Sequence, residues 1–566
     1  MKKMDKVKKI LTEYDCTHIS VHERDDIVFL EGEMDSWNKI VAIGKKVSKS
    51  GLYSHVVNNI HLKGFKQHIS QPSIRDDKLD NRHVDVLVIG GGVVGAAILR
   101  ELTKYNLSCL LVEKGEDLAL QASSRNDGCI HVGVDLHKGS EKLHYLTRSK
   151  EIIKDLCKDI DVEYREDGQT VCFKSNALRP VIRTFFYFRC KQNHITDWKL
   201  LNRKELLKKE PNLSEEVKFG VFFPHAGSIC PYNFTIALAE SAVLNGAEVS
   251  FDTMVEDMVV ENDEIKKVIT NRGTIYPKIV VNAAGVSSDD IADMAHDKFF
   301  TIHPRKGTDV LMDKSVRKQL SNSGIQIFSI KNKSHTSNSK GGGIIPTVDD
   351  NTLVGPNAIE IPEKEDYTTS KEVVDRLFDK HSKTIENLRR GDTITYFSGV
   401  RAPTYEEDFI VSKGKWTKNI IHAAGIQSPG LTAAPAIGET IAKIASEELH
   451  AEKRRDFNPI RKGIVQTRKL SDEERDRLIK ENPKYGHIVC RCEEISEGEI
   501  LDAIHSIIRP NTLDGIKRRV RAGMGRCQGG FCQPNVATLF AKENGIDLKD
   551  VHKKGEDVLI YRNSKE

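Results

Sequence analysis

The feature that most constrains the fold is a glycine-rich turn that directly follows a buried strand. Val86 to Ile89 is a short apolar run, and the sequence GGGVVG at 90–95 comes immediately after it, ahead of a helical segment at 96–102. In this context Gly90 permits a tight turn, Gly92 lets the backbone approach a pyrophosphate, and Gly95 allows close helix–strand packing. The pattern predicts an α/β fold with a dinucleotide-binding site.

An acidic residue supports this prediction. A second apolar strand at 109–112 ends at Glu113, 18 residues after Gly95. A carboxylate at this place is expected to bind an adenosine ribose that carries no 2′-phosphate. FAD and NAD share the fingerprint, so the turn alone leaves both open. Strands at 279–285 and 420–425 also end in small residues, which would let the backbone approach an extended cofactor.

The 566-residue chain is long enough for three or four domains at about 150 residues each. We expect an α/β unit at 1–64, with the order helix, strand, strand, helix, strand, and a polar linker at 65–83. Apolar strands alternate with helices over 84–448. A charged connector follows at 449–484, then a compact module at 485–545 and a tail at 546–566.

Charge and composition exclude several classes of function. Basic residues number 86 and acidic residues 82, so the net charge of +4 gives no general attraction for nucleic acid, and aromatic residues are only 6%. The N-terminus has no apolar run that could serve as a secretory signal. We therefore predict a cytoplasmic protein, in which eleven cysteines argue against a disulfide framework, and leave peripheral membrane contact open.

Four cysteines form two close pairs near the C-terminus. Cys490 and Cys492 make a C-x-C pair, and Cys527 and Cys532 make a C-x4-C pair after 34 intervening residues. Four thiolates can hold one tetrahedral metal ion or a small cluster, although zinc modules more often use C-x2-C pairs. The pattern resembles the bacterioferritin-associated-ferredoxin-like [2Fe-2S] domain, which implies these four residues as cluster ligands. Zinc and unligated thiols are the alternatives.

The local sequence agrees with such a module. Ser496 and Glu499 predict a capping box for a helix that reaches about Ile507, and Thr512 can cap the next helix. Basic residues crowd the second cysteine pair, where they are expected either to form a solvated face or to raise the potential of an anionic cluster. They are Lys517, Arg518, Arg519, Arg521 and Arg526.

Residues 84–448 resemble the D-amino-acid-oxidase-like class of FAD-dependent oxidoreductases, in particular its glycerol-3-phosphate dehydrogenase and L-2-hydroxyglutarate dehydrogenase branch. The matching stretches are SRNDGCIHVG (124–133), PY (231–232), NAAG (282–285), PRKG (304–307), SGVR (398–401) and SPGLT (428–432). The resemblance implies a Rossmann-like FAD-binding domain with an interleaved mixed or antiparallel-sheet substrate domain. It adds these residues to the expected FAD site: Ser124, Ala284, Gly285, Gly425, Gly430 and Leu431.

The same resemblance implies the catalytic residues. His131, in the His–x–Gly motif, is expected to be the base, because the ordinary pKa of histidine lies near neutral pH. Arg401 matches the position where the family holds a substrate carboxylate or phosphate, and Arg305 is a second candidate. The alternative for His131 is an ordinary core histidine, and for each arginine an ordinary ion pair; Lys306 is ambiguous.

We therefore expect a dehydrogenase of a small anionic 2-hydroxy compound. Glycerol 3-phosphate is the first choice, because the A subunit of anaerobic glycerol-3-phosphate dehydrogenase resembles this chain in carrying a cysteine module after its flavin domain. L-2-hydroxyglutarate or another hydroxy acid is the alternative. The second alternative is a non-catalytic redox or ligand-sensing protein. The electron acceptor would be a quinone, a ferredoxin-like protein or a partner subunit.

The N-terminal unit has a weaker resemblance of its own. The stretch VFLEGEMDSW at 28–37, together with the order of elements over 4–64, resembles a BON domain. Such a domain implies binding of a ligand or a membrane surface, and a structural appendage is the alternative.

Overall fold

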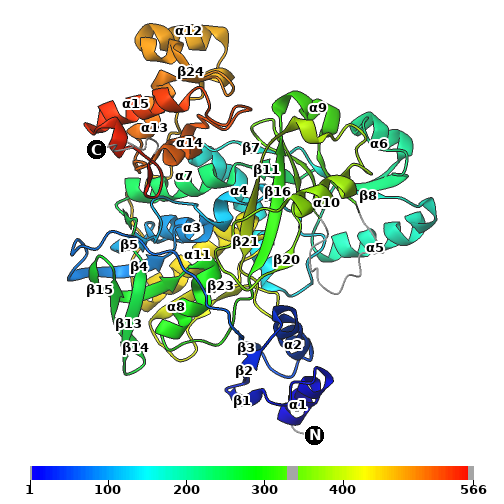
Figure 1. Ribbon diagram of the computed structural model, residues 1–566, viewed down its shortest axis with the longest axis vertical. Coiled ribbons are helices and arrows are strands. Elements are labelled where there is room, and N and C mark those ends of the chain that lie inside the picture. The colour runs from blue at the N-terminus through cyan, green and yellow to red at the C-terminus, as the bar shows by residue number, and fades with distance from the viewer. Residues whose placement is uncertain (1–2, 328–341, 559–566) are drawn as a thin grey trace, which may run out of the picture.

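The computed structural model describes residues 3–327 and 342–558. Two large sheets with their helices form the middle of the molecule, and the N-terminal unit and the C-terminal module lie at opposite ends (Figure 1). No helix in the described part of the chain is long and apolar enough to cross a membrane.

The first sheet is parallel at its centre, as the glycine turn predicts. Its parallel strands run in the order β12 (Glu248–Ser250), β5 (Cys109–Val112), β4 (Arg82–Ile89), β15 (Gly273–Asn282) and β23 (Ile420–Ala424). Antiparallel strands extend it: β13 (Val255–Glu261), β14 (Glu264–Thr270) and β22 (Ile410–Lys413). The carboxyl ends of β4, β5, β15 and β23 therefore meet at one edge, where ligands bind in sheets of this type.

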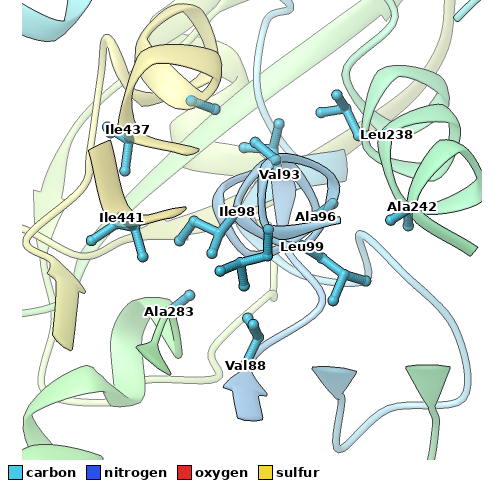
Figure 2. Packing of buried hydrophobic residues seen from close by; sticks show 14 of the residues in the cluster. Val88, Val93, Ala96, Ile98, Leu99, Leu238, Ala242, Ala283, Ile437 and Ile441 are labelled. Carbon is cyan, nitrogen blue, oxygen red and sulfur yellow. The ribbon is translucent and has the colours of Figure 1, made fainter. Parts of the chain in front are cut away.

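The helix that follows the glycine turn is held on several sides. Figure 2 shows α3 (Val93–Leu102) between Leu238 of α7 (Pro231–Leu244) and Ile437 of α11 (Gly430–Glu448), with Val88 of β4 beneath it. Small residues allow this close packing, because a Cβ at Gly438 would lie 2.8 Å from the carbonyl oxygen of Ala97. The N-terminus of α3 is thereby fixed at the end of β4. Helix α4 (Glu141–Asp159) also packs on α11.

The second sheet is mixed and is built from segments interleaved with the first, which confirms the predicted fold class. Its order is β20 (Ile359–Glu360), β16 (Arg305–Met312), β19 (Thr352–Gly355), β18 (Gly343–Pro346), β17 (Gly324–Ile327), β8 (Gln169–Phe173), β10 (Phe219–Phe223) and β9 (Lys199–Asn202), with β21 (Thr393–Arg401) on β16. All described pairs are antiparallel except β8 with β17.

Short elements complete the middle of the molecule. A small sheet is made of β6 (Cys129–Ile130), β11 (Gly227–Ile229) and β7 (Tyr164–Arg165). The remaining helices here are α5 (Arg179–Gln192), α6 (Arg203–Lys209), α8 (Ser288–Met294), α9 (Arg317–Leu320) and α10 (Lys371–His381).

The N-terminal unit has the predicted order of elements. It consists of α1 (Lys3–Glu13), β1 (Ser20–Arg24), β2 (Ile27–Met34), α2 (Trp37–Lys49) and β3 (His55–Leu62). The unit is packed against the rest of the chain: Asn58 Nδ2 donates to Tyr405 Oη at 2.9 Å, and Ile27 and Val57 share a core with Phe299. Strand β4 begins at Arg82, inside the predicted linker.

The C-terminal module contains β24 (Ile488–Cys490), β25 (Ile495–Ser496), α13 (Glu497–Ile504), α14 (Leu513–Val520), α15 (Gln533–Asn544) and the hairpin β26 (His552–Lys554)–β27 (Asp557–Val558), preceded by α12 (Asp472–Glu481). The capping box of Ser496 and Glu499 is confirmed. The helix ends at Ile504, earlier than predicted, because Ile508 enters the core around α3 and its carbonyl accepts from Arg519. Residues 559–566 of the predicted tail lie outside the described residues.

Three of the five basic residues predicted near the cysteines are engaged in buried ion pairs. Arg518 and Arg519 pair with the buried carboxylate of Asp117, and Arg521 pairs with Asp349. Despite burial, which raises it, the pKa of Asp117 is lowered by these two guanidinium groups. The arginines therefore attach the module to the rest of the chain and do not form a solvated face. Arg526, which pairs with Asp313, stays near Cys492.

Candidate functional site

Five of the residues predicted to bind a dinucleotide converge on one pocket at the carboxyl edge of the parallel strands. Gly90, Gly92, Glu113, Ala284 and Gly285 all line it. Other lining residues are Ile69, Lys114, Ser123, Met254 and Ile426. Ile69 belongs to the predicted linker, so this segment closes one side of the pocket.

The glycines fit a pyrophosphate at the N-terminus of α3. Gly90 has φ +112°, and a Cβ there would lie 2.5 Å from the carbonyl oxygen of Ala283. A Cβ at Gly95 would lie 2.0 Å from the carbonyl oxygen of Gly90. A Cβ at Gly92 would instead meet only Ser123 Oγ, at 3.1 Å. Gly90 and Gly95 are therefore needed for the turn itself, whereas Gly92 leaves space in front of a helix N-terminus, where phosphate binds well.

Glu113 and a neighbouring serine shape the same pocket. The Glu113 carboxylate accepts N–H bonds from Gly91 at 2.6 Å and Gly115 at 2.9 Å, and burial raises its pKa. Ser123 Oγ accepts from the N–H of Val93 at 2.9 Å and lines the pocket, whereas the predicted Ser124 donates to the carbonyl of Gln121 at 3.4 Å. Because Ser123 and Ser124 are adjacent, the sequence alone could not show which of them lines the pocket.

The last three predicted cofactor residues lie beside this pocket. Gly425, Gly430 and Leu431 belong to the loop after β23 and to the start of α11, next to Ile426, which lines the pocket. The loop thus connects the dinucleotide pocket with the predicted catalytic histidine.

His131 lies where β6 ends and faces this loop. Its Nε2 is 3.1 Å from Ser428 Oγ, and its backbone N–H donates to Thr432 Oγ1 at 3.1 Å. Ser428 was not among the predicted site residues. The sequence feature that could have identified Ser428 is its position in the loop after a predicted parallel strand. The hydroxyl of Ser428 can orient the imidazole.

Arg401 lies flat on the neighbouring strand β16. A Cβ at Gly307 would lie 2.4 to 2.8 Å from the guanidinium atoms of Arg401, so only glycine leaves room for it. Arg401 Nη1 donates to the carbonyl of Asn357 at 3.2 Å, and within the described residues its side chain is in no ion pair. Burial lowers its pKa, while Asp309 and Asp127 act in the opposite direction. A partly buried guanidinium without a directly bound carboxylate suits an anionic ligand.

Arg305 is the cross-strand neighbour of Arg401, but its charge is already paired. Its Nε donates to Glu360 at 2.9 Å, and its Nη2 pairs with Glu407. Despite burial, which raises it, the pKa of Glu407 falls to about 2 because Arg305 lies against it. The pairing therefore favours Arg401 over Arg305 as the anion-binding residue.

Two lysines near this pair are also occupied. Lys306 pairs with Asp366 at 2.6 Å, and Lys45 of α2 donates to Glu360 at 2.7 Å. The N-terminal unit thus contributes a side chain to the charged network around Arg305. Gln427, in the loop beside His131, donates to Glu407 at 2.6 Å, which joins this network to the site.

The four predicted ligand cysteines come together as two pairs. Cys492 Sγ lies 3.6 Å from Cys527 Sγ, and the Cys532 thiol hydrogen-bonds to Cys490 and lowers its pKa to about 6. Burial raises the pKa of Cys527, but the N–H groups of Phe531, Gly529 and Gly530 and the Cys492 thiol lower it overall. No group of three or more His, Cys, Asp or Glu in the described ranges is placed to hold a metal ion. Two separate thiol pairs suit the two irons of a [2Fe-2S] cluster better than one tetrahedral zinc.

Comparison with known families agrees with both sites. Residues 85–444 match the FAD dependent oxidoreductase family (DAO), and residues 488–542 match the BFD-like [2Fe-2S] binding domain. The first match covers the glycine turn, His131 and Arg401, and the second covers all four ligand cysteines. FAD and a [2Fe-2S] cluster are the cofactors that these families imply, and the residues described above fit both.

Individual relatives extend the comparison. A glycerol 3-phosphate dehydrogenase of Caloramator mitchellensis is 36% identical over 478 residues, which cover 84% of this chain and 98% of that protein. Subunit A1 of anaerobic glycerol-3-phosphate dehydrogenase from Haloferax volcanii is 25% identical, and the match covers 84% of this chain and 86% of that protein. The FAD-bound structure of L-alpha-glycerophosphate oxidase from Mycoplasma pneumoniae aligns with a TM-score of 0.62 and 26% identity, over 67% of this chain and 98% of that one. The chain therefore belongs to the FAD dependent oxidoreductase family and carries a BFD-like [2Fe-2S] domain near its C-terminus.

Proposed function

We propose that this protein is an FAD-dependent dehydrogenase that oxidises glycerol 3-phosphate to dihydroxyacetone phosphate. The observation that carries the substrate class is Arg401, whose guanidinium lies on Gly307 and is in no ion pair within the described residues. Such a group can bind a phosphate through two parallel hydrogen bonds. The names of the relatives support glycerol 3-phosphate among anions of this kind.

Each site residue has a distinct role in this proposal. Arg401 fixes the substrate anion, so that the carbon bearing the hydroxyl has a defined position. His131 accepts the hydroxyl proton as the C–H bond breaks, and Ser428 holds the imidazole in orientation. Bound FAD supplies the hydride acceptor, and the cluster supplies a one-electron exit. Arg305 keeps Glu360 and Glu407 in place beside the site.

L-2-hydroxyglutarate or another 2-hydroxy acid is the alternative substrate, because an arginine fork binds a carboxylate as well as a phosphate. Anaerobic reduction of the bound flavin by a panel of substrates tests the choice. We expect fast bleaching with glycerol 3-phosphate and slow bleaching with hydroxy acids. The reverse order would establish the alternative, and no bleaching with any compound would favour a non-catalytic redox or ligand-sensing protein.

Further parts of the proposal concern the other units. We propose a BON-like N-terminal domain at 1–64, an oxidoreductase unit at 84–448 and a cluster module at 485–545. We also propose a cytoplasmic location. We also propose peripheral contact with a membrane. The electron acceptor would be a quinone, a ferredoxin-like protein or a partner subunit such as the relatives' names imply.

The flavin site can be tested at Gly92. Gly92→Ala should weaken FAD binding about tenfold, or 1.4 kcal/mol, because the new methyl group would occupy space next to the pyrophosphate. Titration of the flavin-free protein with FAD measures the change. Gly391→Ala is the control, since a Cβ at Gly391 meets nothing within 4 Å. Equal FAD affinity in parent and Gly92→Ala would show that the pyrophosphate lies elsewhere.

The cluster can be tested at Cys527. Cys527→Ser should remove the iron and the acid-labile sulfide and abolish the electron paramagnetic resonance signal of the reduced protein. Substrate should still reduce the flavin, because the two sites lie in separate parts of the chain. Cys16→Ala, at a buried cysteine in the N-terminal unit, is the control and should keep both cofactors. Stoichiometric zinc without labile sulfide in the parent would contradict the cluster.

A further inference from the structure

Helix α5 has an apolar surface that the described residues 3–327 and 342–558 leave uncovered. Its buried face is formed by Ile182, Phe186 and Cys190, which pack in the core beside β8 and β10. On another face, Val181, Phe185 and Phe188 are 66%, 49% and 64% exposed, at the spacing of one helical stripe. We call the two phenylalanines, together with the adjacent aliphatic Val181, the aromatic stripe. Tyr187 is exposed on the same helix.

The concentration of such residues is unusual for one surface helix. Sixteen large hydrophobic side chains are exposed in the described part of the chain, and four of them lie on these fourteen residues. Single exposed apolar residues need no explanation, but a contiguous set on one element marks an interaction surface. Figure 1 shows α5 at the outer edge of the second sheet, away from the C-terminal module.

A basic groove lies next to the aromatic stripe. This hollow of about 1030 Å³ is formed by α5 together with β9 and α6, and five of its ten lining residues are basic, while none is acidic. We define the basic groove by these five: Arg179, Arg183, Arg203, Lys204 and Lys218. Within the described residues none of them is in an ion pair. Arg203 and Lys218 donate only to backbone carbonyls.

We propose that the aromatic stripe and the basic groove together bind the surface of a membrane that contains anionic phospholipids. Apolar side chains on a helix that lies in the interface enter the boundary of the acyl chains, and adjacent Lys and Arg residues attract the anionic headgroups. A second copy of the chain is a poorer occupant, because a symmetric contact would place two basic grooves against each other. The inference rests on the membrane contact of the proposed function and names the surface that makes it.

The surface is fixed relative to the catalytic site. At the C-terminal end of α5, Arg189 donates to the carbonyl of Leu136 at 2.9 Å. Asn193, the next residue after the helix, donates to the carbonyl of Gly133 at 2.8 Å. These bonds hold the loop that follows His131. A membrane bound at α5 would therefore keep a constant position relative to the site where the substrate is oxidised.

Sedimentation of the full-length holoprotein with vesicles tests the proposal. The parent should sediment with vesicles of phosphatidylcholine and phosphatidylglycerol, and less in high salt or with phosphatidylcholine alone. The double variant Phe185→Ser/Phe188→Ser should bind at least about tenfold more weakly, because two apolar anchors are lost. Arg183→Gln and Lys204→Gln should each weaken binding about fivefold, as expected for one basic residue near an anionic surface.

Controls separate this inference from the proposed enzyme function. Tyr396→Ser removes an aromatic side chain that is 52% exposed on β21 and should bind vesicles like the parent. All variants should reduce their flavin with substrate at the parent rate in the absence of lipid. Equal vesicle binding by the parent and the double variant would overturn the proposal. So would a dimer in sedimentation equilibrium that only the double variant loses.

Discussion

His131→Asn should lower kcat on the order of 10²–10⁴-fold, the loss expected when a general base is removed. His131 Nε2 faces the hydroxyl of Ser428 in the loop beside the FAD pocket, so its ring is held in one orientation. Asparagine fills a similar space but cannot accept the proton. The KM for substrate should change little, because binding of the anion is assigned to Arg401.

The pH dependence gives a second measurement on this variant. In the parent, the rate of flavin reduction should fall as the pH is lowered, because a protonated imidazole cannot accept another proton. The His131→Asn variant should lose this acidic limb. His137→Asn, at an exposed histidine in the same segment, is the matched control and should behave like the parent. Unchanged rates of flavin reduction in His131→Asn would show that another group is the base.

Arg401→Ala should raise KM about 10- to 150-fold, which corresponds to the loss of a charged hydrogen bond of about 1.5–3 kcal/mol. Its kcat should also fall, because a substrate without a fixed anion seldom reaches the reactive geometry. The KM and kcat of Arg401→Lys should lie between those of the parent and those of Arg401→Ala, since lysine keeps the charge but loses the planar fork. Steady-state kinetics and anaerobic flavin reduction with glycerol 3-phosphate measure these effects.

Arg305→Ala provides the contrast. Removing this side chain takes one buried cationic partner away from Glu360 and Glu407, so the variant should unfold at a lower temperature than Arg401→Ala. If Arg305→Ala instead raised KM as strongly as Arg401→Ala with an unchanged melting temperature, the anion would bind between the two arginines.

Much of the fold was predictable because its signals are local. The buried strand and the glycine turn at 86–95 specify a strand–turn–helix unit by themselves, and the spacing of Ser496 and Glu499 specifies a helix start. The alternation of strands and helices at 4–64 was equally readable. The local sequence did not predict an element's end correctly where a contact with a distant residue decides it. The helix that begins at Glu497 stops at Ile504 because Ile508 is needed in the core around α3.

The sequence by itself located the dinucleotide-binding turn and the two cysteine pairs, because glycine spacing and cysteine spacing are properties of short segments. Only the tertiary structure supplied a physical reason to prefer Arg401 over Arg305, since the acids that neutralise Arg305 are 55 and 102 residues away from it in the chain. It also placed Ser428 against His131 across 297 residues and Asp117 against Arg519 across 402. An ion pair or a hydrogen bond depends on distance in space, and sheet order and helix packing decide which distant residues meet.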